Sequence, residues 1–155
     1  MTLGDVLKKE RERKKLTIED VSSRLGIDVE TYSQMEAGAS PAEEWGPRLA
    51  LIAVALHTPT SRLIAETGKS AQARQVDGQC GRLIGEHLQK RGLSRQDLAA
   101  KLAISSSEME SIENGTTQLE TYAPLLLRFA EIIDQPIFNL FYPCGLPLDK
   151  LTDYR

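Results

Sequence analysis

The sequence repeats itself at an offset of 77 residues, with no insertion or deletion between the two copies. Glycine, proline, acidic and apolar positions align in this register over most of the chain. The identical pairs are Gly4 and Gly81, Leu16 and Leu93, Asp20 and Asp97, Leu25 and Leu102, Ile27 and Ile104, Glu36 and Glu113, Gly38 and Gly115, Glu43 and Glu120, Pro47 and Pro124, Leu49 and Leu126, Ala53 and Ala130, Pro59 and Pro136, and Leu63 and Leu140. Self-similarity at a fixed period indicates a repeated structural unit. We therefore predict an internal duplication, with domains at residues 1–65 and 80–142, a polar linker at 66–79 and a C-terminal tail at 143–155.

Apolar residues within each repeat recur at intervals of three and four, which predicts amphipathic helices. Thr17 and Ser94, each followed three residues later by an aspartate, are the expected N-caps of the second helix. A third helix follows after a three-residue break. We expect it to end at Gly38 or Gly115, because glycine adopts the left-handed conformation without a Cβ penalty. Two helices joined by such a short turn form the helix-turn-helix pattern.

Prolines mark the later helices of both repeats. Pro47 and Pro124 suit the first turn of a fourth helix, where the missing N–H has no partner to lose. A short fifth helix follows Pro59 and Pro136. The buried stripe of the fourth helix is predicted to comprise Leu49, Ile52, Ala53 and Leu56 in the first repeat, and Leu126, Phe129, Ala130 and Ile133 in the second. Aromatic residues make up only 5% of the chain, which also favours helices over strands, so we predict an all-α fold.

The longest apolar run, residues 49–56, is far shorter than the roughly twenty residues of a membrane span. We find no segment with the apolar core of a signal peptide, and we expect a cytoplasmic protein with no membrane partner. Cys80 and Cys144 form neither a disulfide framework nor a metal-ligand spacing, and Cys80 is expected to be a buried thiol. No nucleophile, base and orienting residue can be assembled, so we expect no enzymatic activity, no metal and no cofactor.

Two segments of each repeat resemble the Cro and phage-repressor (XRE) family of helix-turn-helix proteins. Residues 21–28 (VSSRLGID) and 98–105 (LAAKLAIS) are similar to the family pattern L-A-x-x-L-G-V-S. Residues 32–38 (YSQMEAG) and 109–115 (MESIENG) are similar to its ending I-x-x-I-E-x-G. The resemblance implies two tandem five-helix domains of the lambda-repressor type. It also implies a sequence-specific regulator of transcription that lays its third helix in the major groove of double-stranded DNA.

The resemblance also implies where DNA would be contacted. The base-facing residues would be Val29, Glu30, Thr31, Ser33 and Gln34 in the first repeat, and Ser106, Ser107, Glu108, Glu110 and Ser111 in the second. Thr17, Ser94 and Arg95, at the start of each second helix, would contact phosphates. Gln34 can make two hydrogen bonds to adenine, and the two third helices would read two unlike half-sites about one helical turn apart.

The charge of the third helices departs from what DNA binding favours. Neither contains Lys or Arg, and the chain carries a formal net charge of -3. Phosphate contacts supply much of DNA affinity. The main positive reservoir is a run near the N-terminus, interleaved with Glu10 and Glu12, that equally fits a solvated helix face; it comprises Lys8, Lys9, Arg11, Arg13, Lys14 and Lys15.

A second interpretation is therefore a protein-interaction or dimerisation module on the same fold, with one or both repeats having lost DNA binding. Residues 7–17 also resemble the cytoplasmic domain of the RodZ family, which binds a cytoskeletal protein. In the Cro family the glutamate matching Glu36 pairs with an arginine of the first helix, which Arg11 supplies here. The second repeat has Leu88 at that position, so Glu113 needs another partner.

The fifth helices of the two repeats differ in polarity. Residues 60–64 begin with polar side chains, whereas residues 137–142 are nearly all apolar. Too few polar positions remain in the second copy for all of them to face one small core. We predict an interface at Ile137, Phe138 and Phe141, with the other repeat, a second chain in a homodimer, or the C-terminal tail as the partner surface.

Overall fold

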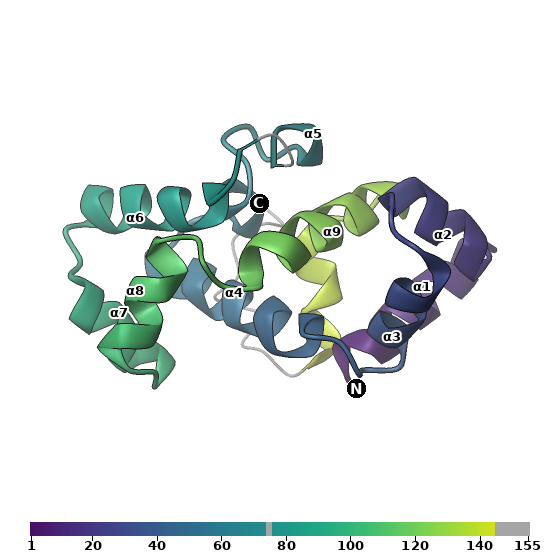
Figure 1. The fold of residues 1–155 in the computed structure, drawn as a ribbon, viewed down its shortest axis with the longest axis horizontal. Coiled ribbons are helices and arrows are strands. Elements are labelled where there is room, and N and C mark those ends of the chain that lie inside the picture. Colours follow the sequence, from purple (N-terminus) through teal and green to yellow (C-terminus); the bar gives the residue numbers. More distant parts are fainter. Residues whose placement is uncertain (74–75, 145–155) are drawn as a thin grey trace.

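The computed structural model describes residues 1–73 and 76–144, and every regular element within them is a helix. This confirms the predicted all-α fold (Figure 1). In chain order the elements are α1 (Leu3–Arg13), α2 (Ile18–Leu25), α3 (Val29–Glu36), α4 (Ala42–Leu56), the 3-10 helix η1 (Thr60–Leu63), α5 (Ser70–Ala73), α6 (Gln79–Arg91), α7 (Arg95–Leu102), α8 (Ser106–Glu113), α9 (Leu119–Ile132), and the 3-10 helices η2 (Ile137–Leu140) and η3 (Tyr142–Cys144). Most of the predicted tail lies outside the described residues.

Helices recur in the structure at the offset seen in the sequence. The bounds of α2, α3 and η1 become those of α7, α8 and η2 when 77 is added. Equivalent caps open the second helix of each repeat: the Thr17 hydroxyl accepts from the Asp20 N–H, and the Ser94 hydroxyl accepts from the Asp97 N–H, each at 3.0 Å. The local signals in the two copies therefore produce the same helix boundaries.

A glutamate ties the fourth helix of each repeat to the first. The Glu43 carboxylate accepts hydrogen bonds from the backbone N–H groups of Leu3 and Gly4. The Glu120 carboxylate accepts from the equivalent N–H groups at the start of α6. A Cβ atom on Gly4 would overlap the carbonyl oxygen of Glu36, so only glycine allows α1 to approach α3 this closely. Gly81 is confined in the same way against α8.

The prediction that Pro47 and Pro124 lie in the first helical turn is wrong. Both lie inside their helices, because α4 already begins at Ala42 and α9 at Leu119. In α4 the Ser40 hydroxyl accepts from the Ala42 N–H at 3.1 Å and supports this earlier start. The additional turn also positions Glu43 to bond α1.

The long helices α4 and α9 cross at the centre of the molecule and exchange partners (Figure 1). Helix α9 packs on α2 and α4 packs on α7, while η2 packs on α1 and η1 packs on α6. The Tyr32 ring of α3 stacks on the Phe129 ring of α9, with centroids 6.3 Å apart. We call α1–α3 with α9 and η2 the first lobe, and α6–α8 with α4 and η1 the second lobe.

Contacts between the repeats follow an approximate two-fold relation. Lys14 forms an ion pair with Asp134 at 3.6 Å. Arg91, which is equivalent to Lys14, donates to the carbonyl oxygen of His57 at 2.9 Å, and His57 is equivalent to Asp134. Such reciprocal contacts are typical of an isologous dimer interface. The sequence boundaries 1–65 and 80–142 remain predictions, since each lobe contains residues of both ranges.

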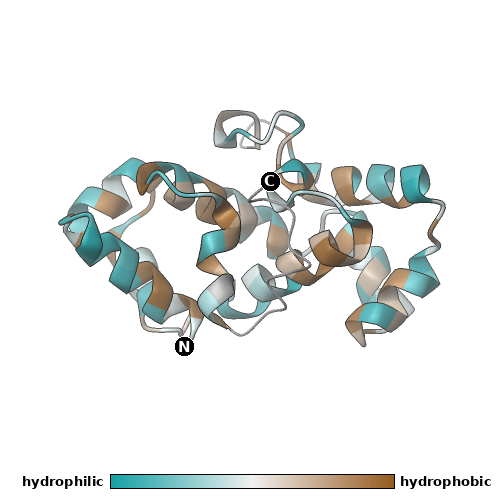
Figure 2. Ribbon diagram, turned by 180° about the vertical axis from the view of Figure 1, so that it is seen from behind, coloured by the Kyte–Doolittle hydropathy of each residue, from teal (hydrophilic) through white to brown (hydrophobic). Residues whose placement is uncertain are grey.

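The buried apolar side chains of both repeats form one continuous core. In Figure 2 the long helices alternate hydrophobic and hydrophilic residues, as amphipathic helices around a shared core do. Cys80 is buried as predicted, and burial raises the pKa of its thiol. None of the described helices combines the length and apolarity needed to cross a bilayer.

Candidate nucleic-acid interface

The third helix of the first repeat is held by an aspartate cap and two buried side chains. Asp28 precedes α3 and accepts from the Thr31 N–H at 2.7 Å. Hydrogen bonds from Thr31 lower the pKa of the Asp28 carboxyl, because they stabilise its charged form. Tyr32 and Met35 are fully buried and anchor the inner face of α3. The opposite face of the helix is therefore presented outward in a defined orientation.

The predicted base-facing residues all lie on the outer sides of the third helices. In α3, Val29, Glu30 and Gln34 are exposed, and Thr31 and Ser33 are half-buried. In α8, Met109 and Ile112 are buried, and the outer residues are Ser106, Ser107, Glu108 and Glu110, which are exposed, and Ser111, which is half-buried. Figure 1 places α3 in one lobe and α8 in the other.

The residues predicted to contact phosphates have different surroundings in the two repeats. The hydroxyls of Thr17 and Ser94 are exposed and cap α2 and α7. Arg95 is instead paired with glutamates of α8: it contacts Glu113 at 2.5 Å and Glu110 at 4.0 Å. A phosphate would have to compete with these carboxylates for the Arg95 guanidinium.

The predicted pair of Arg11 and Glu36 is confirmed. The Arg11 Nε donates to Glu36 at 2.6 Å and Nη2 donates to its second oxygen at 3.1 Å. A third donation, to the Leu16 carbonyl, ties α1 to the segment before α2. The Tyr32 side chain lies beside this pair, and burial together with the Glu36 carboxylate raises the pKa of its hydroxyl. Glu36 therefore has a structural role.

Glu113 forms its ion pair with a different helix from the one that pairs with Glu36. Leu88 occupies the position of Arg11 in α6, and the second repeat uses Arg95 of α7 instead. The resemblance to the Cro family implies a phosphate contact for Arg95 and gives no partner for Glu113. The sequence contains a signal for this pair, because Arg95 carries a basic charge where the first repeat has an apolar side chain, Ile18.

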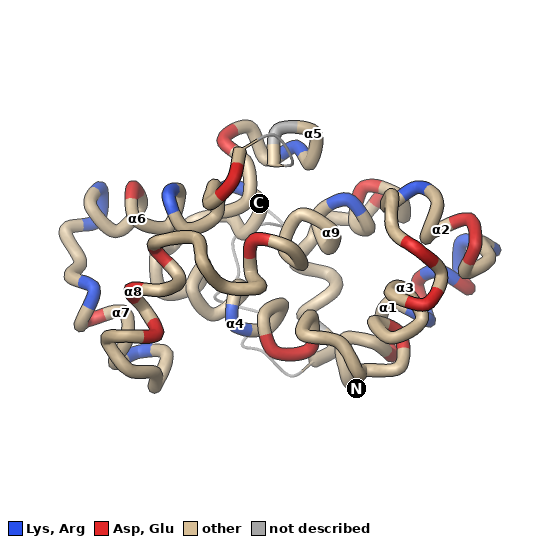
Figure 3. Tube along the Cα trace, viewed as in Figure 1, with Lys and Arg blue, Asp and Glu red and all other residues tan. Residues whose placement is uncertain are grey.

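The helix-turn-helix segments carry more acidic than basic residues. Residues 17–38 contain five acidic residues and one basic residue, Arg24. Residues 94–115 contain four acidic residues and two basic ones, Arg95 and Lys101. Figure 3 shows acidic and no basic positions along α3 and α8. Any DNA bound here would depend on base contacts more than on phosphate neutralisation.

The three predicted interface residues lie largely inside the chain. Ile137 and Phe141 are buried, and Phe138 is half-buried. Phe141 lies at the crossing point, where a Cβ atom on Gly46 would contact it together with Leu3 of α1. Residues of the first repeat thus cover part of this apolar segment, and the predicted interface remains a prediction.

No group of three or more His, Cys, Asp or Glu side chains converges as a metal site within the described ranges. Comparison with known families gives a match over residues 2–63, to a family described as a helix-turn-helix domain. The first repeat contains a helix-turn-helix domain. This domain indicates a DNA partner and a regulatory role. No curated protein and no solved structure matches the chain.

Proposed function

We propose that the chain is a sequence-specific, DNA-binding regulator of transcription of the Cro and phage-repressor type, built by internal duplication and acting in the cytoplasm. The observation that carries this proposal is the outer face of α3. It lies within the helix-turn-helix domain and presents polar side chains on a helix that two buried residues, Tyr32 and Met35, hold in place. Such a face suits hydrogen bonding to base edges.

The residues of α3 have the chemistry for direct readout. The Gln34 amide can donate to and accept from one adenine, and the Glu30 carboxylate can accept from a cytosine amine. In α8 the serines Ser106 and Ser107 suit several base edges. Because the two faces differ, the proposed site consists of two unlike half-sites read by one chain, with the exchanged repeats acting as a covalent pseudo-dimer.

Binding of the full chain to the DNA upstream of its own gene, and to a random-site pool, tests this proposal. We expect binding that resists competitor DNA and has a shallow salt dependence, because few phosphates are neutralised. Gln34→Ala should weaken binding by roughly 1–3 kcal/mol, the typical worth of a bidentate base contact. Ser111→Ala, at the equivalent position of α8, is the matched control and should have a smaller effect. Absence of binding to both DNA samples near physiological salt would falsify the proposal.

The acidic third helices favour a second candidate function, recognition of a basic protein surface. Glu110 and Glu113 already hold the guanidinium of Arg95, which is the kind of group such a partner would present. If DNA does not bind, Glu30→Lys and Glu108→Lys should abolish capture of the partner. Under the DNA proposal the same variants should strengthen nonspecific DNA binding instead.

A further inference from the structure

A hollow of about 530 Å³ lies between α6 and the segment around η1, so both repeats contribute to its wall. The first repeat supplies Thr58 and Arg62, and α6 supplies His87, Lys90 and Arg91. These residues of α6 lie on the opposite side of the helix from Gly81 and Gly85, which face α8. We call this feature the basic hollow. Its position separates it from the proposed DNA-reading face of α8.

The acidic residues at the rim of the basic hollow are already paired. Arg82 contacts Glu66 at 3.0 Å and Glu86 at 3.2 Å, so one guanidinium offsets one of the two carboxylate charges, and the three cations Arg62, Lys90 and Arg91 outweigh the charge that remains. Arg62 and Arg91 donate instead to backbone carbonyl oxygens, of Glu66 and His57 respectively. A carbonyl orients a guanidinium without cancelling its charge. Within the described residues, Arg62, Lys90 and Arg91 thus converge with no carboxylate partner.

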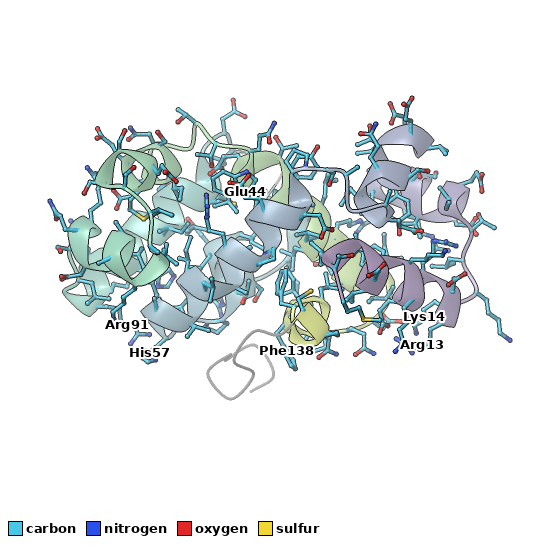
Figure 4. The ribbon with its side chains drawn as sticks, turned by 90° about the horizontal axis from the view of Figure 1, so that it is seen from below. Arg13, Lys14, Glu44, His57, Arg91 and Phe138 are labelled. Atoms are coloured by element: carbon cyan, nitrogen blue, oxygen red, sulfur yellow. The ribbon has the colours of Figure 1, made fainter. Side chains whose placement is uncertain are left out.

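The equivalent place in the first lobe is neutralised. Arg13 and Lys14 correspond to Lys90 and Arg91, but Arg13 pairs with Glu10 and Lys14 pairs with Asp134. In the second lobe the positions of those two acidic residues are occupied by His87 of α6 and by His57, which directly follows α4. Figure 4 shows Arg91 with His57, and Arg13 with Lys14, along the same edge of the molecule on either side of Phe138.

His87 is affected by burial and by the cations of the basic hollow. Its pKa is lowered, first by burial and then by the charges of Lys90, Arg91 and Arg62, against a smaller opposing effect of Glu86. The imidazole is therefore predominantly neutral near pH 7. A bound anion would reverse this by favouring the imidazolium.

We propose that the basic hollow binds a small phosphorylated ligand, whose phosphate oxygens are held by Arg62, Lys90 and Arg91. Guanidinium groups match phosphate oxygens in geometry as well as in charge, and a dianion satisfies several cations at once. The ligand would bridge η1 of the first repeat and α6 of the second. Because only the folded chain brings these elements together, binding would stabilise the joined repeats.

Titration of the full chain with inorganic pyrophosphate, at ionic strength held constant with chloride, tests this site. Calorimetry should show one saturable site with half-saturation below about 1 mM. Proton NMR of the imidazoles should show that pyrophosphate raises the pKa of His87. Failure to reach saturation by about 10 mM would overturn the proposal.

Variants at equivalent positions of the two repeats distinguish pyrophosphate binding in the basic hollow from nonspecific attraction to surface charge. His87→Glu recreates the arrangement around Glu10 and should weaken pyrophosphate binding at least tenfold, as should Lys90→Ala. Arg13→Ala removes the equivalent cation of the first repeat and should change binding less than twofold. Equal weakening by Arg13→Ala and Lys90→Ala would show nonspecific attraction and refute the assignment. Addition of duplex DNA should not compete with pyrophosphate; competition would identify the DNA backbone as the source of the phosphate.

Discussion

The two repeats satisfy the same glutamate in different ways. Glu36 is held by Arg11 of α1, with side chains 7% and 11% exposed, respectively. Glu113 is held by Arg95 of α7, with side chains 15% and 42% exposed. The helical framework is the same in both, so the fold requires a charge partner for this carboxylate but not a particular helix to provide it. The first repeat has an inward-facing pair that ties three segments together, and the second has a pair open to solvent.

The largest expected effect in this comparison of the repeats comes from the exchange of α4 and α9 between the lobes. Phe129 belongs to the second repeat, yet it packs on Tyr32 of the first lobe. Phe129→Ala should cost about 3–5 kcal/mol, because truncating a buried aromatic side chain leaves a cavity. Native-state hydrogen exchange should show the largest loss of protection in α2 and α3, which are far from Phe129 in the sequence.

Ile52→Ala is the matched control, since Ile52 is the equivalent residue of α4 and is also buried. It should cost about 2–5 kcal/mol and expose mainly α7 and α8. If each variant instead loosened only its own repeat, the exchanged arrangement would be incorrect.

The next largest effect is expected at the two glutamates. Arg11→Leu gives the first repeat the residue type that the second repeat has at this position, Leu88. The substitution leaves Glu36 unpaired beside Tyr32. We expect a loss of about 3 kcal/mol in the free energy of unfolding, because an uncompensated buried charge is costly. Arg95→Leu should cost no more than about 1 kcal/mol, as for an exposed ion pair. Urea unfolding measures both, and equal losses would remove the distinction between the repeats.

A smaller difference lies in the turn before the third helix. Gly26 has φ of 75°, and its counterpart Ala103 holds a similar left-handed conformation at φ of 57°. Ala103→Gly should stabilise the chain by roughly 1 kcal/mol, since an L side chain is disfavoured there. Gly26→Ala should destabilise it by a similar amount. Thermal unfolding should shift in opposite directions for the two variants, and a shift in the same direction would contradict this account.

The smallest expected effect is a difference between the caps of the two third helices in how their contribution to stability depends on pH. The pKa of Asp28 is below its usual 3.8 in the folded chain, so its contribution is present above pH 3.8 and is lost as the pH falls through the lowered value. Ser105, the cap of α8, does not titrate. Asp28→Ser should flatten the acid limb of stability measured by urea unfolding, and Ser105→Asp should steepen it. An unchanged acid limb in both variants would mean that other groups dominate it.

Much of the local structure follows from the sequence. The 77-residue register, the caps at Thr17 and Ser94, the glycines that follow α3 and α8, and the pair of Arg11 with Glu36 depend on signals a few residues long or on a resemblance carried by them. The same holds for the outer faces of the third helices, because a 3.6-residue period assigns each position to one side of a helix. The sequence signal at Pro47 predicts a start of α4 about a turn later than the observed one at Ala42.

The tertiary structure alone decided which repeat each long helix completes. The apolar stripes of α4 and α9 share one pattern, so either helix fits either lobe as far as sequence periodicity can determine. The choice depends on the path of the chain after α3 and α8 and on packing between residues far apart in the sequence. The burial of Phe141 and the convergence of Arg62 with Lys90 follow from that choice, because each joins segments that periodicity cannot relate.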